Sequence, residues 1–439
     1  MSTLTFKRGV HPPENKLTAD CPIRDLQPVG PLVFPMSQHI GAPCKPTVAP
    51  GDRVLVGQVI GEPQGFVSAP VVSSVSGTVK AVAPVMTIAG TVCPAVTVDS
   101  DGLYEEAPLS PCGDIESLDP ATIRDVIKNT GIVGMGGAGF PTFIKLTPPK
   151  DAVVDQLIIN ASECEPYLTC DYRLILEDPQ PIMDGIRALL VLFPEAKLSV
   201  GIEDNKPEAI AKFQVLLDGF DERASLKVLK SKYPQGGEKQ LIYAITGRSV
   251  PPGKLPADVG AIVCNTYTTY DIGYALRHGR TSLKRIITVS GDAIANPGNY
   301  RVPLGISVRE VLDAAGGFTA EPMKLLAGGP MMGMSLHSLD VPVVKGTSGL
   351  LALTAAALKV RPETRCIRCG RCIEACPMGL LPSALDAVVR LQDYKAFQAR
   401  GGMNCIECGA CTYSCPAGRF LTQTCKEGKK YVAAMNRKK

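Results

Sequence analysis

Eight of the sixteen cysteines repeat one pattern near the C-terminus, C-x2-C-x2-C-x3-C-P. The first copy runs from Cys366 to Pro377 and the second from Cys405 to Pro416. In this spacing three thiolates close together bind one [4Fe-4S] cluster, and the fourth cysteine of each run binds the other cluster. The pattern therefore predicts two [4Fe-4S] clusters and a protein that transfers single electrons.

The predicted ligands form two sets that exchange their last cysteine. The first-run cluster takes Cys366, Cys369, Cys372 and Cys415, and the second-run cluster takes Cys405, Cys408, Cys411 and Cys376. Disulfides and zinc are the alternatives, but zinc prefers two pairs of ligands with a longer gap between them, which leaves the middle cysteine of each run unexplained. Three further cysteines without partners at ligand spacing are predicted to be structural: Cys164, Cys170 and Cys425.

Composition sets limits on the fold and on the partners. A chain of 439 residues with 45% apolar side chains can fill roughly three domains. A net charge of +4 is too small to favour nucleic acid as a partner. No secretory signal and no apolar run of membrane-spanning length is found, so a soluble or peripheral protein is expected. Free cysteines arranged as metal ligands fit a reducing cytoplasm.

Residues 1–115 are rich in valine, proline and glycine and predict an all-β sandwich or small barrel. The segment from Pro50 to Val54, with Ser76–Val79 further on, resembles the lipoyl and biotinyl carrier fold. A carrier needs a lysine at the tip of its hairpin, and 63–66 contain none. This N-terminal domain is therefore predicted to be structural and not lipoylated.

Residues 116–284 alternate between helical and strand patterns and predict an α/β domain. Its first helix should be capped by Asp119, begin at Pro120 and end before Gly131. The other elements expected here are strands at 157–160 and 198–202 and helices at 181–193 and 207–217.

The remaining segments are shorter. Residues 285–345 resemble a β-grasp domain, with a strand at 286–291, a turn at 297–299 and a helix at 308–315. A linker is predicted at 346–360, a two-cluster ferredoxin domain at 361–418 and a basic tail at 419–439.

Gly134–Gly139 satisfies the dinucleotide pattern G-x-G-x-x-G, but its context differs from that of a Rossmann fold. In a Rossmann fold the glycines follow a strand and open a helix, whereas here a helix is predicted to precede them. A helix beginning at Pro141 could still let backbone N–H groups hold a phosphate. The glycine pattern alone is a weak indication of a nucleotide.

The residues around this loop resemble the NADH-oxidising flavoprotein subunit of respiratory complex I. Four segments match in the same order over about 140 residues, which makes the resemblance specific. These segments are Gly134–Thr142 with Lys145, Asn160–Pro166 with Asp171–Arg173, Tyr233–Glu238, and Cys264–Thr268. The resemblance implies an FMN site that exchanges hydride with NAD(H).

The resemblance also implies individual roles. The loop backbone, at Gly134, Gly136, Gly137 and Gly139, would approach the flavin phosphate and ribityl chain, and Phe140 would lie near the nicotinamide nucleotide. Lys145 and Asn160 would hold the flavin. The nicotinamide side would be lined by Glu163, Glu165 and Glu238. The pocket would be completed by Tyr233, Asn265 and Thr268, with Ser162 and Gly236 from the matched segments.

The chain as a whole resembles the RnfC subunits of the Rnf-type ion-translocating ferredoxin:NAD⁺ oxidoreductases. The resemblance rests on the order of the modules, on His11–Lys16 (HPPENK) and Gly328–Gly333 (GGPMMG), and on the double cysteine run. It implies a translocase subunit, peripheral on the cytoplasmic side of the cell membrane, that works with the ferredoxin-like RnfB subunit and with membrane subunits. Electron flow between ferredoxin and NAD(H) would be coupled elsewhere in the complex to Na⁺ or H⁺ transport.

Two other functions stay open at this point. A soluble cobalamin reductase can be built from similar flavin and ferredoxin modules, although the N-terminal β domain and its HPPENK segment weigh against it. The other alternative is a non-catalytic electron-wiring scaffold. Departures from the complex I pattern at Ser162, Gly237 and Cys264 keep that alternative open.

Overall fold

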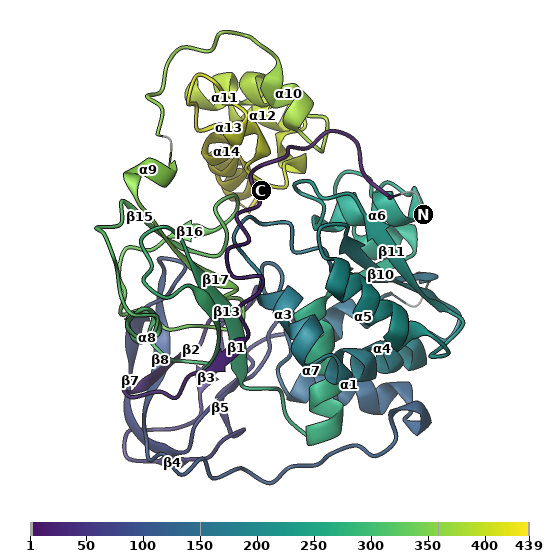
Figure 1. Ribbon diagram of the computed structural model, residues 1–439, viewed down its shortest axis with the longest axis vertical. Coiled ribbons are helices and arrows are strands. Elements are labelled where there is room, and N and C mark those ends of the chain that lie inside the picture. Colours follow the sequence, from purple (N-terminus) through teal and green to yellow (C-terminus); the bar gives the residue numbers. More distant parts are fainter. Residues whose placement is uncertain (1–2, 150, 359, 438–439) are drawn as a thin grey trace.

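The computed structural model describes residues 3–149, 151–358 and 360–437. Two β-rich units and an α/β unit lie side by side, and a small helical domain from the C-terminal part of the chain sits above them in the view of Figure 1. This is the multidomain α/β and β architecture that the sequence predicts. Among the described residues, no helix combines the length and the apolar character needed to cross a bilayer.

The N-terminal unit is a barrel-sandwich of two small antiparallel sheets, ordered β2-β8-β7-β4 and β3-β5-β6. Alternation of apolar and polar residues along the long strands β7 and β8 places one face in the core, around Phe34, Ile60 and Val96. The strands are β2 (Leu32–Pro35), β3 (Lys45–Pro46), β4 (Arg53–Val54), β5 (Val59–Glu62), β6 (Val71–Val72), β7 (Gly77–Met86) and β8 (Val92–Ser100).

The α/β unit has a four-stranded parallel sheet in the order β11-β10-β9-β12. Its strands are β9 (Gln156–Ala161), β10 (Lys197–Glu203), β11 (Ala224–Leu229) and β12 (Ala261–Asn265). Its helices are α1 (Pro120–Asn129), α2 (Thr142–Lys145), α3 (Cys170–Glu177), α4 (Gln180–Leu192), α5 (Pro207–Leu217), α6 (Glu238–Thr246) and α7 (Thr266–His278), with short 3-10 turns at Ile115–Ser117 and Pro256–Val259.

The helix and strand predictions for this unit are confirmed. Asp119 caps α1 by accepting from the backbone N–H groups of Ala121 and Thr122, and Gly131 follows the helix with a positive φ of 75°. The four other predicted elements correspond to β9, α4, β10 and α5, with bounds that differ by at most one residue.

The third unit is a mixed six-stranded sheet, β1-β14-β13-β17-β15-β16, with helix α8. Its elements are β1 (Ile23–Asp25), β13 (Lys284–Ser290), β14 (Gly298–Pro303), α8 (Val308–Ala314), β15 (Lys324–Ala327), β16 (Met334–Ser335) and β17 (Gly349–Leu353). The predicted turn at 297–299 is wrong, because β14 already begins at Gly298.

Part of the predicted linker is a core strand. β17, inside the linker predicted at 346–360, pairs in parallel with β13 and antiparallel with β15, and all five of its residues are buried. A short run of five apolar residues has no helical or alternating period, so only the neighbouring strands reveal its place. The helix α9 (Ala355–Leu358) follows it.

The C-terminal domain consists of short helices around the cysteines. They are α10 (Arg371–Ala375), α11 (Pro382–Arg390), α12 (Tyr394–Ala399), a 3-10 turn at Gly402–Asn404, α13 (Ala410–Tyr413) and α14 (Leu421–Arg437). Most of the predicted basic tail is α14, which buries Cys425 and Val432 against α11 and α12. The prediction of a tail is wrong for this helix because its inner face is packed: a Cβ at Gly428 would lie 2.8 Å from Phe397. Lys429 also contacts the domain, since its ammonium donates to the Cys405 carbonyl at 2.9 Å.

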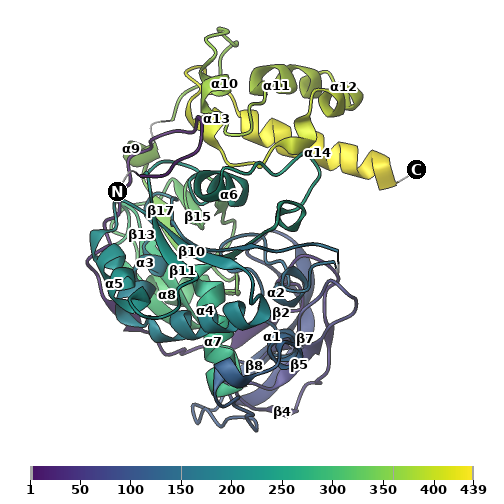
Figure 2. The same cartoon turned by 90° about the vertical axis from the view of Figure 1, so that its right-hand side faces the viewer.

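The N-terminal segment runs between the α/β unit and the helical domain, as the dark purple trace in Figure 1 shows and Figure 2 repeats from the side. Leu4 forms a bridge with Leu229, and Val10 forms one with Tyr233. The guanidinium of Arg8 donates to the carbonyl of Ile373 in the helical domain. This segment therefore connects the two units that carry the predicted cofactor sites.

Candidate flavin and iron–sulfur sites

The glycine loop is closed on one side and open on the other. The Gly134 N–H donates to the Phe140 carbonyl at 2.9 Å, and the Met135 N–H donates to the Thr268 hydroxyl at 2.9 Å. A Cβ at Gly136 would lie 2.8 Å from the Asn265 amide, whereas a Cβ at Gly137 would meet no atom within 4 Å. The loop thus rests on residues 265 and 268 and offers bare backbone at Gly137 to a ligand.

Two asparagines at the carboxyl ends of parallel strands support this loop and its neighbours. Asn265 ends β12, caps α7 and donates to the Asp171 carboxylate at 2.7 Å. Asn160, in β9, donates to the Gly236 carbonyl at 2.9 Å and accepts from the Ser162 N–H at 3.2 Å. The carboxyl edge of a parallel sheet is the usual place for a nucleotide. The structure brings the four matched segments together at this edge.

Lys145 and Glu238 form an ion pair at the same edge. The Lys145 ammonium donates to the Glu238 carboxylate at 3.0 Å and to the Val263 carbonyl at 2.9 Å. Burial has the largest single effect and lowers the pKa of Lys145, but Glu238 and the Cys264 thiol together raise it by more, so the net pKa is raised and the lysine stays charged. Both side chains remain partly open to solvent. This pair can therefore face an anionic ligand with a fixed cation.

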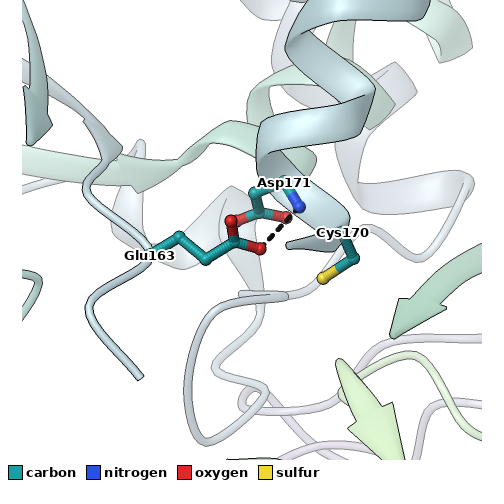
Figure 3. Close-up of side chains that lie close together, drawn as sticks. All are labelled: Glu163, Cys170 and Asp171. Atoms are coloured by element: carbon teal, nitrogen blue, oxygen red, sulfur yellow. Dashed lines mark hydrogen bonds between the residues drawn. The ribbon is translucent and has the colours of Figure 1, made fainter. Parts of the chain in front are cut away.

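Glu163 has a capping position in this structure. Its two carboxylate oxygens accept from the backbone N–H groups of Asp171 and Tyr172, at 2.8 and 3.2 Å, at the start of α3. Figure 3 shows the carboxylate beside Asp171 and Cys170, and the possible ligand atoms of these three residues lie within 4.8 Å of one another. Helix capping accounts for the arrangement, because Thr169, at the N-cap position, makes no side-chain cap. The cluster therefore needs no metal ion to explain it.

Glu165 points toward the third unit. Its carboxylate accepts from the N–H groups of Met331 and Met332, at 3.0 and 2.8 Å, and lies 3.4 Å from the hydroxyl oxygen of Tyr233. A Cβ at Gly329 would overlap this carboxylate, so a glycine is required there. The segment Gly328–Gly333 thus binds Glu165, a role that the sequence did not predict. Burial raises the pKa of Glu165 to about 7.

This raised pKa predicts a pH-dependent effect of Glu165→Gln. The folded chain keeps a proton that the unfolded chain releases, so Glu165 lowers the free energy of unfolding as pH rises from its ordinary value of 4.5 to about 7. Glutamine removes this loss but gives up one backbone hydrogen bond. We therefore expect the free energy of unfolding of Glu165→Gln to exceed that of the parent by about 1–2 kcal/mol above neutral pH, and not to exceed it near pH 5. Thermal unfolding midpoints of both proteins across this range measure the difference. A difference that does not vary with pH would contradict the assignment.

Tyr233 joins the predicted flavin site to the helical domain. It is 1% exposed, and its hydroxyl donates to the Cys408 carbonyl at 2.7 Å. Around it pack Val10, Ala375 and Ala410. The sequence placed Tyr233 in the flavin pocket; the structure places its hydroxyl at the boundary with the second cysteine run.

The eight predicted cluster ligands surround two separate cavities. One cavity is lined by Cys376, Cys405, Cys408 and Cys411, and the other by Cys366, Cys369, Cys372 and Cys415. In each cavity the cysteine from the other run is present, as the predicted exchange of ligands requires. Four thiols around one cavity is the donor set that a [4Fe-4S] cluster needs, so the residues fit the group.

The two cavities differ in exposure. Cys366 and Cys369 are exposed, whereas none of the four cysteines of the second-run set is. Ile367, between these two cysteines, is 67% exposed. Ile406, in contrast, packs with the apolar cluster around Tyr233, a residue of the α/β unit. The first-run site therefore faces outward and the second-run site faces the α/β unit.

Cys425 is a site residue that sequence reasoning missed. It was predicted to be structural, but it also lines the second-run cavity. Its position in α14, one turn beyond Leu421, gave no sign of this because it stands outside the ligand spacing.

Comparison with known proteins assigns a domain family to each unit. Residues 4–103 match the RnfC barrel sandwich hybrid domain and 127–274 the Nuo51 FMN-binding domain. Residues 286–335 match the SLBB domain and 357–420 the 4Fe-4S dicluster domain. Thus the fold expected for each unit is supported independently of its geometry.

Two relatives share much of the sequence over all or most of their length. The chain is 43% identical to the C subunit of the Na(+)-translocating ferredoxin:NAD(+) oxidoreductase complex of Acetobacterium woodii, covering 99% of this chain and 98% of that protein. It is also 43% identical to the C subunit of the proton-translocating ferredoxin:NAD(+) oxidoreductase complex of Clostridium ljungdahlii, covering 87% and 84%. Among solved structures, an NAD+-reducing [NiFe]-hydrogenase in the H2-reduced state has a similar fold, with a TM-score of 0.50, 17% identity and coverage of 76% and 71%.

Proposed function

Because the chain belongs to the RnfC family of ion-translocating ferredoxin:NAD⁺ oxidoreductase subunits, we propose that it is the part of such a complex that exchanges electrons with NAD(H). It takes hydride at an FMN site and passes single electrons through two [4Fe-4S] clusters. The observation that carries this is the contact between Tyr233, which opens one of the matched flavin segments, and the backbone of Cys408. Full-length similarity to these relatives favours this function over a cobalamin reductase.

A flavin, when bound, supplies the conversion between the two electrons of hydride and the single electrons of a cluster. The chain supplies position and charge. Gly137 lets the backbone approach the ligand, and the Lys145 ammonium gives a fixed positive charge near it. Asn160, Ser162, Gly236, Asn265 and Thr268 shape the rest of the pocket through the hydrogen bonds described above.

The arrangement of the cavities gives an order for the relay. The second-run cluster lies next to the flavin-binding unit, since Tyr233 contacts Cys408. The first-run cluster has its exposed cysteines on the outer side of the domain. Electrons from NADH would therefore pass through the second-run cluster first and leave through the first-run cluster to another subunit.

The partners follow from this placement. The other subunits of the membrane complex, including the ferredoxin-like RnfB subunit and the membrane subunits, would receive or deliver electrons at the exposed first-run site. Three exposed arginines, at positions 365, 368 and 371, surround that site and form no ion pair among the described residues. We place the chain on the cytoplasmic side of the membrane, where NAD(H) is available, with Na⁺ or H⁺ transport in other subunits.

One experiment tests the proposal directly. The chain is purified without oxygen, its flavin is released and measured by fluorescence, and NADH-dependent reduction of a viologen dye is followed. Both flavin and turnover are expected. Cluster-replete protein that lacks both would instead support the electron-wiring scaffold.

Glu238→Ala is expected to lower NADH-dependent dye reduction about ten- to hundredfold, because Lys145 loses the carboxylate that fixes its position. The visible and EPR spectra of both clusters should be unchanged, since Glu238 lies outside both cavities. Glu222→Ala, at an exposed position of the same unit, serves as the control. Loss of the cluster spectra in the Glu238 variant would contradict its placement.

A further inference from the structure

The HPPENK segment, His11–Lys16, ends in a lysine that binds one loop of the flavin unit from outside. The Lys16 ammonium donates to three backbone carbonyls, those of Glu163, Glu165 and Leu168, at 2.8, 2.9 and 2.6 Å. An ammonium has three protons. All of them are therefore used on a single loop, about 150 residues away along the chain.

That loop, residues 163–168, has little of its own to hold it in shape. It lies between β9 and α3, outside any regular element. Glu163 and Tyr167 have positive φ angles of 50° and 69°, which cost conformational energy in residues other than glycine. Three carbonyls that point to one spot also repel one another unless a cation lies between them. Lys16 supplies that cation.

Neighbouring contacts attach the same segment to the same loop. The Tyr167 N–H donates to the Glu14 carbonyl at 2.9 Å. The hydroxyls of Thr18 and Thr169 lie 2.6 Å apart in a buried position. The N-terminal segment therefore follows the loop from residue 14 to residue 18.

We propose that Lys16 is a positioning residue for the nicotinamide side of the flavin site, acting through the 163–168 loop. The inference rests on the proposed function, because it is the loop's Glu165 and the adjoining Tyr233 that lie between the flavin unit and the clusters. The hydrogen bonds of the Lys16 ammonium go to backbone carbonyls of the loop. Its effect is on where Glu163 and Glu165 are held.

The charges around Lys16 are consistent with this role. Burial lowers the pKa of Lys16, and Lys206 acts in the same direction, while Glu163 and Glu203 act to raise it. Lys206 itself donates to the Ser162 carbonyl and to the Glu203 carboxylate. Lys206 thus binds the carbonyl of the residue just before the loop and Lys16 binds the first carbonyl of the loop, and both ammonium groups have carboxylates nearby.

The test compares full-length variants that carry FMN and both clusters. Lys16→Met removes the charge and the three donors but keeps the length of the side chain, whereas Lys16→Arg keeps charge and donors. Lys232→Met is the matched control, because Lys232 binds the same N-terminal segment at the Phe6 carbonyl and does not touch the loop. Each protein is measured by amide hydrogen exchange of the peptide that covers 163–172 and by steady-state kinetics with NADH.

In the Lys16→Met protein we expect the backbone amides of Tyr167, Asp171 and Tyr172 to exchange hydrogen faster than in the parent, since their hydrogen bonds depend on the shape of the loop. The KM for NADH should rise about tenfold or more with a smaller change in kcat, and flavin and iron should be retained. Lys16→Arg should recover part of both effects, and Lys232→Met should show neither.

Unchanged exchange in Lys16→Met, with KM within about twofold of the parent, would overturn the proposal. If Lys16→Met does not fold, Lys16→Gln, which keeps a neutral donor, replaces it and is judged by the same two measurements. The exchange measurement needs no turnover. A parent protein without NADH activity would therefore contradict the proposed function, while faster loop exchange in the variant would still support the positioning role.

Discussion

Cys376→Ser is expected to remove the second-run cluster and to leave the first-run cluster in place. Iron should fall from about eight to about four atoms per chain, although Cys376 belongs by sequence to the first run. The reason is that Cys376 lines the cavity of Cys405, Cys408 and Cys411. Iron analysis and EPR of the dithionite-reduced protein measure the result. NADH should still reduce the flavin, but electrons should no longer reach the remaining cluster.

The reciprocal variant is the control for this exchange of ligands. Cys415→Ser should remove the first-run cluster, because Cys415 lines the cavity of Cys366, Cys369 and Cys372. Cys21→Ser, whose side chain lines neither cavity, should keep all of the iron. Loss of the first-run cluster in Cys376→Ser would refute the assignment.

Gly137→Ala is expected to weaken FMN binding about ten- to hundredfold without changing the stability of the flavin-free chain. A Cβ there meets no protein atom within 4 Å, and its φ is not positive, so the apoprotein can accept a methyl group. The methyl group would occupy the space through which the backbone approaches the ligand. Overpacking of this kind costs about 1–3 kcal/mol. Fluorescence titration of the flavin-free chain with FMN measures the affinity.

Two other glycines complete this experiment. Gly113→Ala also adds a methyl group to open space but lies outside the site, so it should change neither stability nor FMN affinity. Gly136→Ala should disturb both, because its Cβ would lie 2.8 Å from the Asn265 amide. An FMN affinity in Gly137→Ala equal to that of the parent would show that the flavin does not lie against this loop.

The position of Glu165 shows why sequence similarity alone leaves a site incomplete. The complex I resemblance implies that Glu163, Glu165 and Glu238 share one side of the ligand. In the structure they have three different partners: the N-terminus of α3, the backbone at Met331 and Met332, and Lys145. The assignment of these carboxylates to the nicotinamide side stays a prediction, and the variants above test it.

Local sequence patterns were enough to predict the features whose residues lie close together in the chain. Cluster ligands two or three residues apart, the cap at Asp119 and the glycine loop before Pro141 are all such local patterns, because their geometry follows from a few backbone angles. The order of the four matched segments likewise gave the flavin unit before any contact was known.

Features that depend on contacts between distant segments were visible only in the folded structure. It placed β17 in the middle of a sheet, made α14 part of the helical domain, and brought Cys425 to the second-run cavity. It also directed Lys16 to the carbonyls of the 163–168 loop. Partners so far apart are chosen by packing and by the need to satisfy buried polar groups, and neither leaves a fixed spacing in the chain.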